Sequence, residues 1–177
     1  MQGREILLGV TGGIAAYKAA VLASRLVQAG AGVSVVMTHS ATQLVGPRTF
    51  EALTGRPVRT EVFDDTKIHA HIDLAREAEL FCIVPATANI LGKMACGVAD
   101  DLLSTIYLSF RGPVLVAPAM NCEMWEKKIV QRNVTQLIAD GVIFVGPETG
   151  RLSCGEFGVG RMAEPEKILQ AVQTTLI

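Results

Sequence analysis

Five short apolar runs, separated by segments of helical pattern, constrain the fold of this chain more than any other feature. Several of them are apolar at consecutive rather than alternating positions, which is typical of parallel strands covered on both faces. Strands that alternate with helices predict an α/β fold with a doubly wound, mainly parallel sheet of the Rossmann-like or flavodoxin-like kind. The predicted strands are Glu5–Val10, Val33–Met37, Leu80–Val84, Val114–Ala117 and Val142–Val145.

The intervening segments carry helix boundary signals. Glycine favours the position after a helix, aspartate the N-cap and proline the first turn. Because the sequence has no internal repeat, low-complexity segment or linker, we expect residues 1–177 to form a single domain. The predicted helices are Ile14–Ala29 before Gly30, Glu126–Asp140 before Gly141, Leu102–Phe110 capped by Asp100 or Asp101, and a last helix with Pro165 in its first turn.

Composition narrows the class of protein. Half of the residues are apolar and the mean hydropathy is +0.38, yet no apolar run reaches the roughly 20 residues of a membrane-spanning helix. The excess of apolar residues therefore predicts a large core and a subunit interface. A net charge of -1 argues against nucleic acid or an anionic membrane surface as the partner.

The cysteines and the N-terminus indicate the compartment. The first residues lead directly into the first predicted strand, without the pattern of a signal peptide. The cysteines form neither a Cys-x-x-Cys pair nor a zinc-finger spacing. We therefore expect a reduced, cytoplasmic protein. The cysteines are Cys82, Cys96, Cys122 and Cys154.

A glycine-bearing turn, VTGGIAAYK at 10–18, joins the first predicted strand to the first helix. Its glycines permit a tight turn, and the helix N-terminus offers free N–H groups to an anion. It is neither the dinucleotide fingerprint nor Walker A, because Tyr17 stands before Lys18. The second strand ends at Thr38 and Ser40 without an acid for an NAD ribose. These residues favour a mononucleotide such as FMN, with an ordinary tight connection as the alternative.

The segment PAMNCEM at 118–124 follows the fourth predicted strand, where open α/β sheets bind ligands. It offers one amide and two thioethers but no strong acid or base, so it is suited to enclosing a substrate. His69 and His71 could serve as a base or stabilise an anion, or be solvated loop residues. A metal site would lack a third ligand. Arg76 could bind a carboxylate or phosphate or be a surface charge.

Four glycines lie within residues 150–160. They predict a mobile flap without secondary structure of its own, and such loops often close over active sites. Cys154 lies in this flap and could be reactive or incidental, whereas Cys82 is embedded in a strand. Cys96 and Cys122 are interpreted as structural or incidental.

Together these segments resemble the flavin-containing cysteine decarboxylases, above all the phosphopantothenoylcysteine decarboxylases. The matching segments extend from Gly12 to Met162, nearly the whole chain. Ile90 departs from the pattern, because the family usually has threonine at this position. The isoleucine could cost this chain one hydrogen bond to the cofactor. The matching stretches are GGIAAYK at 12–18, PATANI at 85–90, GVADDLL at 97–103, HIDL at 71–74, PAMNCEM at 118–124 and CGEFGVGRM at 154–162.

The resemblance implies FMN-dependent decarboxylation of 4′-phosphopantothenoylcysteine to 4′-phosphopantetheine in coenzyme A biosynthesis, through thioaldehyde and enethiol intermediates. It implies that His71 assists the oxidation and decarboxylation, that Asn121 orients the substrate's carboxylate or amide, and that Cys154 donates the final proton. Implied FMN-binding residues are Gly12, Gly13, Ile14, Thr38, Ser40, Thr87, Ala88 and Asn89. Implied substrate-binding residues are Arg76, Ala119, Met120, Asn121, Met124, Gly155 and Met162.

Three alternatives share part of this pattern. A peptidyl-cysteine decarboxylase of peptide maturation would lack the flap cysteine, and a flavin prenyltransferase would lack both Asn121 and that cysteine. A non-catalytic FMN-binding regulatory protein would have lost site residues that are intact here. The resemblance also implies a homo-oligomer, a trimer or trimer-based assembly, with FMN at subunit contacts. Any phosphopantothenoylcysteine synthetase partner is expected to be a separate chain or absent.

Overall fold

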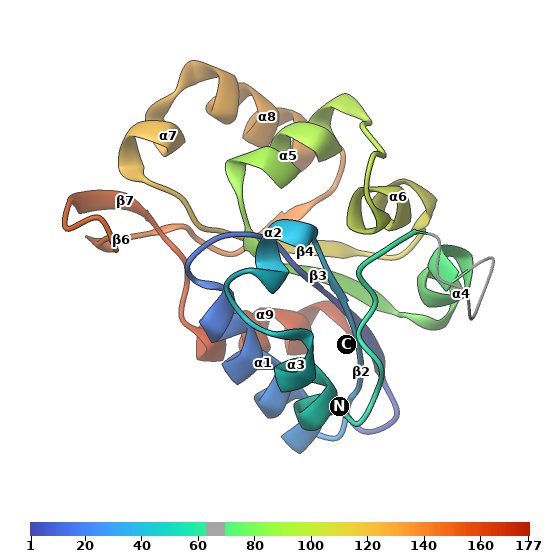
Figure 1. Ribbon diagram of the computed structural model, residues 1–177. Helices are drawn as coiled ribbons and strands as arrows, with labels where there is room; N and C mark the ends of the chain where they lie inside the picture. Colours follow the sequence, from blue (N-terminus) through green and yellow to red (C-terminus); the bar gives the residue numbers. More distant parts are fainter. Residues whose placement is uncertain (63–69) are drawn as a thin grey trace.

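The computed structural model describes residues 1–62 and 70–177, with residues 70 and 71 described through their backbone alone. A five-stranded parallel sheet forms its centre, in the order β2-β1-β3-β4-β5 (Figure 1). This is the strand order of a flavodoxin-like, doubly wound fold, and it confirms the predicted class. The strands are β1 Glu5–Val10, β2 Gly32–Met37, β3 Leu80–Ala86, β4 Val114–Pro118 and β5 Ile143–Phe144.

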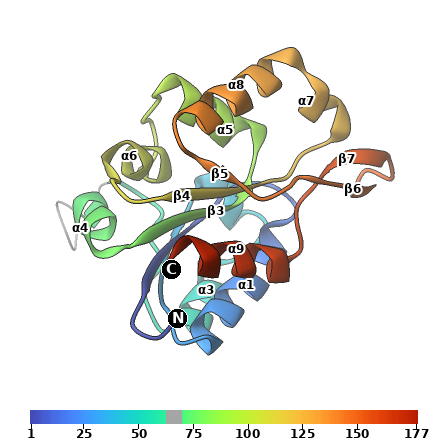
Figure 2. The ribbon, with the colours of Figure 1, turned by 180° about the vertical axis from the view of Figure 1, so that it is seen from behind.

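Helices cover both faces of the sheet, as Figures 1 and 2 show from opposite sides. Each face has its own apolar cluster, and every residue of β3 and β4 is buried between the two. This two-sided burial explains why the strands have consecutive apolar residues. One face is covered by α1 Ala16–Gln28, α3 Pro47–Thr54 and α9 Pro165–Thr175, and the other by α4 Ala70–Glu77, α5 Ala88–Cys96, α6 Leu102–Ser109 and α8 Lys128–Ala139.

Most predicted boundaries agree with the structure. All five strands are present within two residues of their predicted ends. Asp101 caps α6 through a reciprocal capping box with Ser104, and Pro165 opens α9. The first helix begins at Ala16, two residues later than predicted, because residues 14 and 15 form a turn.

The helix predicted over residues 126–140 is wrong at its start. The structure has two helices there, α7 Cys122–Glu126 and α8 Lys128–Ala139. Lys127 separates them, because its ψ of 127° interrupts the helical backbone. The break allows Asn121 to cap a short helix of its own directly after β4.

The flap predicted as a structureless loop is a β-hairpin, so that prediction is wrong. Strands β6 Glu148–Arg151 and β7 Phe157–Arg161 pair antiparallel, and the hairpin lies beside α7 (Figures 1 and 2). Its turn is closed by hydrogen bonds from Leu152 N–H to Glu156 O, at 2.8 Å, and from Gly155 N–H to Leu152 O, at 3.0 Å. Within the described residues, no helix is both long and apolar enough to cross a membrane.

Candidate active site

Loops at the carboxyl ends of β1 to β4 enclose a cavity of about 980 Å³. Open α/β sheets bind their ligands at this edge. All the predicted cofactor and substrate residues line it except Arg76 and Gly155. Lining residues come from the ranges 11–18, 38–40, 87–93, 119–124, 151–154 and 160–162, with Asp101.

The glycine-bearing turn after β1 forms one wall. Thr11 is buried, and its Oγ1 donates to the carbonyl of Pro85 at 2.6 Å, which ties this turn to the end of β3. A Cβ on Gly12 would lie 2.3 Å from the Cβ of Ser40, so only glycine allows the two loops to approach so closely. Among the described residues, the amides of Gly12 and Ile14 have no hydrogen-bond partner. Lying just before α1, they are placed to bind an anion.

Two further loops add hydroxyl groups to this wall. Thr38 caps the short helix α2, His39–Thr42, by accepting from the Ala41 N–H at 3.3 Å. Thr87 caps α5 in the same way, accepting from the Ile90 N–H at 3.3 Å. A hydroxyl that accepts in a cap can still donate its own proton, so both residues have a donor to offer a ligand.

Ser40, Asn89 and Ile90 complete this part of the cavity wall. Ser40 and Asn89 are exposed beside the cavity, and their side chains have no hydrogen-bond partner among the described residues. The Ile90 side chain is only 1% exposed and packs in the core. It therefore brings no polar side-chain contact to the cavity.

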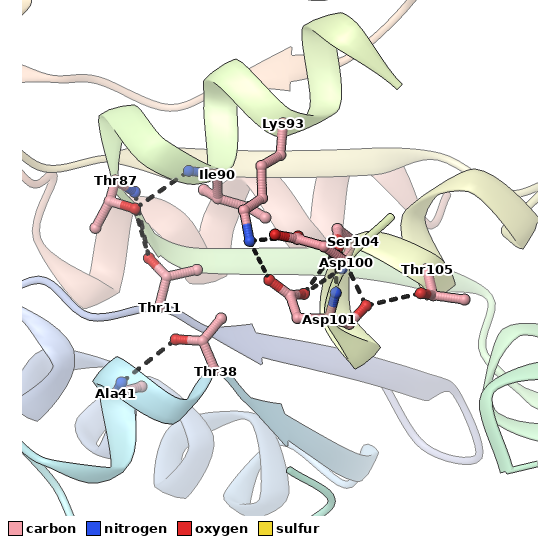
Figure 3. A network of polar contacts seen from close by, with 10 residues as sticks. All are labelled: Thr11, Thr38, Ala41, Thr87, Ile90, Lys93, Asp100, Asp101, Ser104 and Thr105. Carbon is pink, nitrogen blue, oxygen red and sulfur yellow. Dashed lines mark hydrogen bonds and ion pairs between the residues drawn. The ribbon is translucent and has the colours of Figure 1, made fainter. Parts of the chain in front are cut away.

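A partly buried ion cluster that was not predicted from the sequence lies next to these loops (Figure 3). Lys93 Nζ lies 2.5 Å from Asp100 Oδ1 and 2.6 Å from Asp101 Oδ2. Burial disfavours the charged ammonium, but the two carboxylates outweigh it and raise the pKa of Lys93. The Asp101 carboxyl also loses solvent, while hydrogen bonds from Lys93 and Ser104 lower its pKa overall. The cluster fixes the start of α6 against α5.

Asn121 is positioned by its role as the cap of α7. Its Oδ1 accepts from the Glu123 N–H at 2.8 Å, so the amide nitrogen is the part left to bind other groups. The preceding backbone is held in place as Ala119 N–H donates to Ala86 O and Met120 N–H donates to Gly160 O, both at 3.0 Å. Asn121 therefore presents a fixed N–H donor at the cavity.

The β6–β7 hairpin closes the other side. A Cβ on Gly160 would lie 2.2 Å from the Met120 carbonyl oxygen, and the φ of Gly160 is 150°, so glycine is required for this contact. Met162 is buried at the cavity wall, and Met124 is 46% exposed on α7. Gly155, with a φ of 93°, makes the hairpin turn without lining the cavity.

The hairpin turn brings Cys154 to Asn121. Asn121 Nδ2 lies 3.5 Å from Cys154 Sγ and 2.5 Å from Glu156 Oε2. The same Glu156 oxygen is 3.4 Å from Cys154 Sγ and 3.6 Å from Cys122 Sγ. Hydrogen bonds from Asn121, Cys154 and Cys122 lower the pKa of Glu156. Desolvation and the Glu156 carboxylate raise the pKa of Cys122.

Glu156 contacts Asn121, Cys154 and Cys122, but neither Glu156 nor Cys122 lines the cavity, and neither was among the predicted site residues. The sequence signal was weak, because Cys122 occupies an unassigned position within PAMNCEM and Glu156 resembles any exposed turn residue. Cys122 was interpreted as structural or incidental, and its Sγ lies 3.6 Å from Glu156 Oε2.

Of the candidates His69, His71 and Arg76, the structure describes the side chain of Arg76 alone. His69 lies outside the described residues, and His71 belongs to α4, where only its backbone is described. Arg76 is exposed on α4 and does not line the cavity. Helix α4 packs on α6 and lies on the opposite side of the molecule from the β6–β7 hairpin (Figures 1 and 2).

The remaining candidates have other surroundings. Cys82 is buried in β3, and burial raises the pKa of its thiol, so it stays protonated. Cys96 is exposed at the end of α5. His39 is exposed and contributes to the cavity wall. Among the side chains that the structure describes, those of residues 1–62 and 72–177, no three histidine, cysteine or carboxylate groups form a metal site.

Comparisons with known proteins identify the family of the chain. The flavoprotein family profile matches residues 1–177. The chain is 47% identical over 175 residues to the Bacillus subtilis coenzyme A biosynthesis bifunctional protein CoaBC, and this match covers 98% of the chain and 43% of that protein. The chain thus spans less than half the length of this relative.

Two solved structures are similar over almost their entire length. A cysteine-to-serine mutant of PPC decarboxylase, complexed with pantothenoylaminoethenethiol, has a TM-score of 0.87 and 32% identity, covering 97% of each chain. The FMN-dependent cysteine decarboxylase SpaF has a TM-score of 0.85 and 35% identity, covering 98% of this chain and 95% of its own. The chain therefore belongs to the flavoprotein family, together with PPC decarboxylase and the FMN-dependent cysteine decarboxylases.

Proposed function

We propose that the chain is an FMN-dependent decarboxylase that converts 4′-phosphopantothenoylcysteine to 4′-phosphopantetheine in coenzyme A biosynthesis. The observation that carries this proposal is the approach of Cys154 Sγ to within 3.5 Å of Asn121 Nδ2 at the cavity. An amide that can hold a carboxylate then stands beside a thiol that can donate a proton. The similarity to CoaBC and to PPC decarboxylase supports the same reaction.

The three loops at one end of the cavity fit FMN. The free amides before α1 and the hydroxyls of Thr38 and Ser40 are suited to bind the phosphate of FMN. Because Gly12 has no side chain, its loop lies close to Ser40, and both sets of donors face the same part of the cavity. When bound, FMN supplies reversible two-electron redox chemistry, which the side chains of the protein cannot provide. The residues proposed to hold it are Gly12, Gly13, Ile14, Thr38, Ser40, Thr87, Ala88 and Asn89.

The other end of the cavity is proposed to bind the substrate. The amide of Asn121 would hold the carboxylate while the cysteinyl group is oxidised to a thioaldehyde by loss of two electrons, which bound FMN would accept. The bond to the carboxylate then breaks, CO2 leaves, and the electron pair of that bond stays on the substrate as an enethiolate. In the reductive half, one carbon of the enethiol would receive the two electrons back as hydride, and Cys154 would give its proton to the other carbon, with the thiolate left on sulfur. Apolar walls exclude water and so favour each of these steps. The wall is formed by Ala119, Met120, Met124 and Met162, with Gly155 closing the hairpin turn.

We propose that His71 assists oxidation and decarboxylation and that Arg76 binds an anionic group of the substrate. Because α4 lies away from the cavity within one chain, these roles require α4 of a second copy. A homo-oligomer, a trimer or a trimer-based assembly, would supply it. Exposed apolar side chains at the cavity mouth, Ile14 and Tyr17, are suited to such a contact.

The wider setting is also proposed. Residues 1–177 are taken to form a single domain in a cytoplasmic enzyme. This chain spans 43% of CoaBC, which is a bifunctional protein. A phosphopantothenoylcysteine synthetase is therefore the expected partner. We expect the enzyme to bind neither nucleic acid nor a membrane.

The similarity to SpaF, an FMN-dependent cysteine decarboxylase, is equally compatible with a second candidate, decarboxylation of a peptidyl cysteine. An enzyme of that kind stops at the enethiol. Cys154 at the cavity argues against it, because a thiol donor is needed only if the enethiol is reduced.

Mass spectrometry of the product tests the proposal. The FMN-loaded protein is incubated with 4′-phosphopantothenoylcysteine, and the expected product has lost CO2 alone. Loss of CO2 and two hydrogens would instead indicate an enzyme that stops at the enethiol. If the substrate is unchanged while a peptide ending in cysteine is decarboxylated, the second candidate replaces the first.

A further inference from the structure

The side chain of Asn121 is left to bind hydrogen-bond acceptors. Because its Oδ1 is occupied by the Glu123 N–H in the cap of α7, the side chain faces its surroundings with N–H donors alone. In the structure, the partner of that donor is the carboxylate of Glu156, at 2.5 Å. The group proposed to bind there during the reaction, the carboxylate of the substrate, has the same charge and the same acceptor atoms.

The Glu156 carboxylate is held by exchangeable contacts. Its partners are the amide of Asn121 and the thiols of Cys154 and Cys122, all uncharged donors, and among the described residues no lysine or arginine pairs with it. Glu156 is exposed at the end of the hairpin turn. Hydrogen bonds to an exposed group are weak enough to be replaced by those of a ligand.

Resting on the proposed function, we propose that Glu156 holds the place of the substrate carboxylate on Asn121. The substrate displaces Glu156 when it binds. Glu156 returns once CO2 has left, because the carboxylate that occupied Asn121 then no longer exists. Glu156 is a positioning residue in this scheme, and its exchange orders the two halves of the reaction.

The return of Glu156 also brings the proton donor. Cys154 lies two residues before Glu156, and its Sγ is 3.4 Å from the oxygen that binds Asn121. The S–H bond of Cys154 breaks as a C–H bond forms on one carbon of the enethiol, and the other carbon would receive hydride, with its two electrons, from bound reduced FMN. The thiolate left on Cys154 then takes a proton from water. Cys154 is therefore held back from the substrate until decarboxylation is complete.

Two ligands that differ only in the carboxylate test this competition. The first is 4′-phosphopantothenoylserine, which bears the carboxylate but lacks a thiol to oxidise, and the second is 4′-phosphopantothenoylethanolamine. Calorimetry on the FMN-loaded protein gives the ratio of their affinities. Glu156→Gln should change this ratio about threefold in favour of the carboxylated ligand. The reason is that the side chain at position 156, which competes with the ligand carboxylate for Asn121, has lost its charge.

The matched control is Glu123→Gln, which removes the same charge two residues from Asn121. Glu123 is exposed and uses its backbone N–H, not its side chain, to bind Asn121. This variant measures how much the loss of a nearby negative charge alone, without any change in the partner of Asn121, favours an anionic ligand. The affinity ratio should remain that of the unaltered protein.

A second readout is the product. Glu156→Gln should release CO2 from 4′-phosphopantothenoylcysteine at a rate close to that of the unaltered protein, with a larger share of enethiol. An affinity ratio that is unchanged or lower in Glu156→Gln, or that shifts equally in Glu123→Gln, would overturn the inference while the proposed function stands. An unaltered protein that binds neither ligand and releases no CO2 would overturn both.

Discussion

The two ends of the cavity are built in different ways. At the end proposed for FMN, three loops are tied to one another by the buried bond from Thr11 to the Pro85 carbonyl and by the close approach of Gly12 to Ser40. At the end proposed for the substrate, the hairpin touches α7 mostly through exposed side chains, among them Cys154 and Glu156.

This difference separates the binding of the cofactor from the handling of the substrate. Loops fixed by helix caps and buried hydroxyls keep one geometry, and so form a site in advance of the ligand. Exposed hydrogen bonds at the hairpin can be exchanged at little cost in free energy. If this account is right, mutations at the two ends should have separable effects.

The largest effect is expected for Gly12→Ala. Its Cβ would lie 2.3 Å from the Cβ of Ser40, so the two loops must move apart and the cofactor end loses its shape. We expect FMN affinity, measured by fluorescence titration, to fall about 100-fold. The matched control is Gly46→Ala, because no atom lies within 4 Å of a Cβ there and Gly46 has a φ of -66°. Unchanged FMN affinity in Gly12→Ala would contradict the account.

Gly160→Ala tests the other end. Its Cβ would lie 2.2 Å from the Met120 carbonyl oxygen, which pushes the hairpin away from Asn121. A displacement of about 1 Å at a reacting group can cost about 100-fold in rate, so we expect turnover to fall by that factor while FMN still binds. Loss of FMN affinity as large as in Gly12→Ala would show that the two ends are not separable.

Thr11→Val tests how much the buried hydroxyl of Thr11 contributes to the shape of the cofactor end. The substitution keeps the shape but leaves the Pro85 carbonyl without the hydroxyl that donates to it at 2.6 Å. We expect the free energy of unfolding, from urea titration, to fall by about 2 kcal/mol and FMN affinity to fall about tenfold. Thr135→Val is the control, because Thr135 is exposed on α8 and its hydroxyl bonds only within that helix. A change no larger than that of the control would argue against a preorganised loop.

The smallest effect concerns the ion cluster beside the cofactor end. Because the folded protein lowers the pKa of Asp101, its charge stabilises the fold above the ordinary carboxyl pKa, and this contribution is lost as the pH falls through the lowered value. Asp101→Asn keeps a capping side chain, so we expect a loss of about 1 kcal/mol at neutral pH. Urea titrations should give converging stabilities for the two proteins in acid. A difference that persists in acid would contradict the electrostatic explanation.

The sequence was most informative where burial decides the pattern. Runs such as Leu80–Ala86 are buried at every position, so their consecutive apolar residues identify the strands and the sheet type. The loop that carries Gly12 could be identified because a tight turn before a helix requires particular residues. The cap of α6 was expected at Asp100 or Asp101 for the same reason, and Asp101 is the residue that caps it.

The sequence was least informative where contacts between distant segments determine the local structure. The β6–β7 hairpin contains Gly150, Gly158 and Gly160 and has little strand propensity, and it pairs because it packs on α7 and on Met120. Lys93 meets its carboxylates only when α5 and α6 pack together. Helix α3 was missed although its boundaries carry signals, with Pro47 in the first turn and Gly55 as a left-handed C-cap.

The most direct test of the central claim is the ratio of CO2 released to fully reduced thiol product, compared between the unaltered protein and Cys154→Ser. The account predicts a ratio of one for the unaltered protein. In Cys154→Ser, CO2 release should continue, but reduced product should fall about 100-fold, the usual loss when a proton donor is removed. A ratio that stays at one in Cys154→Ser would show that the hairpin thiol does not complete the reaction.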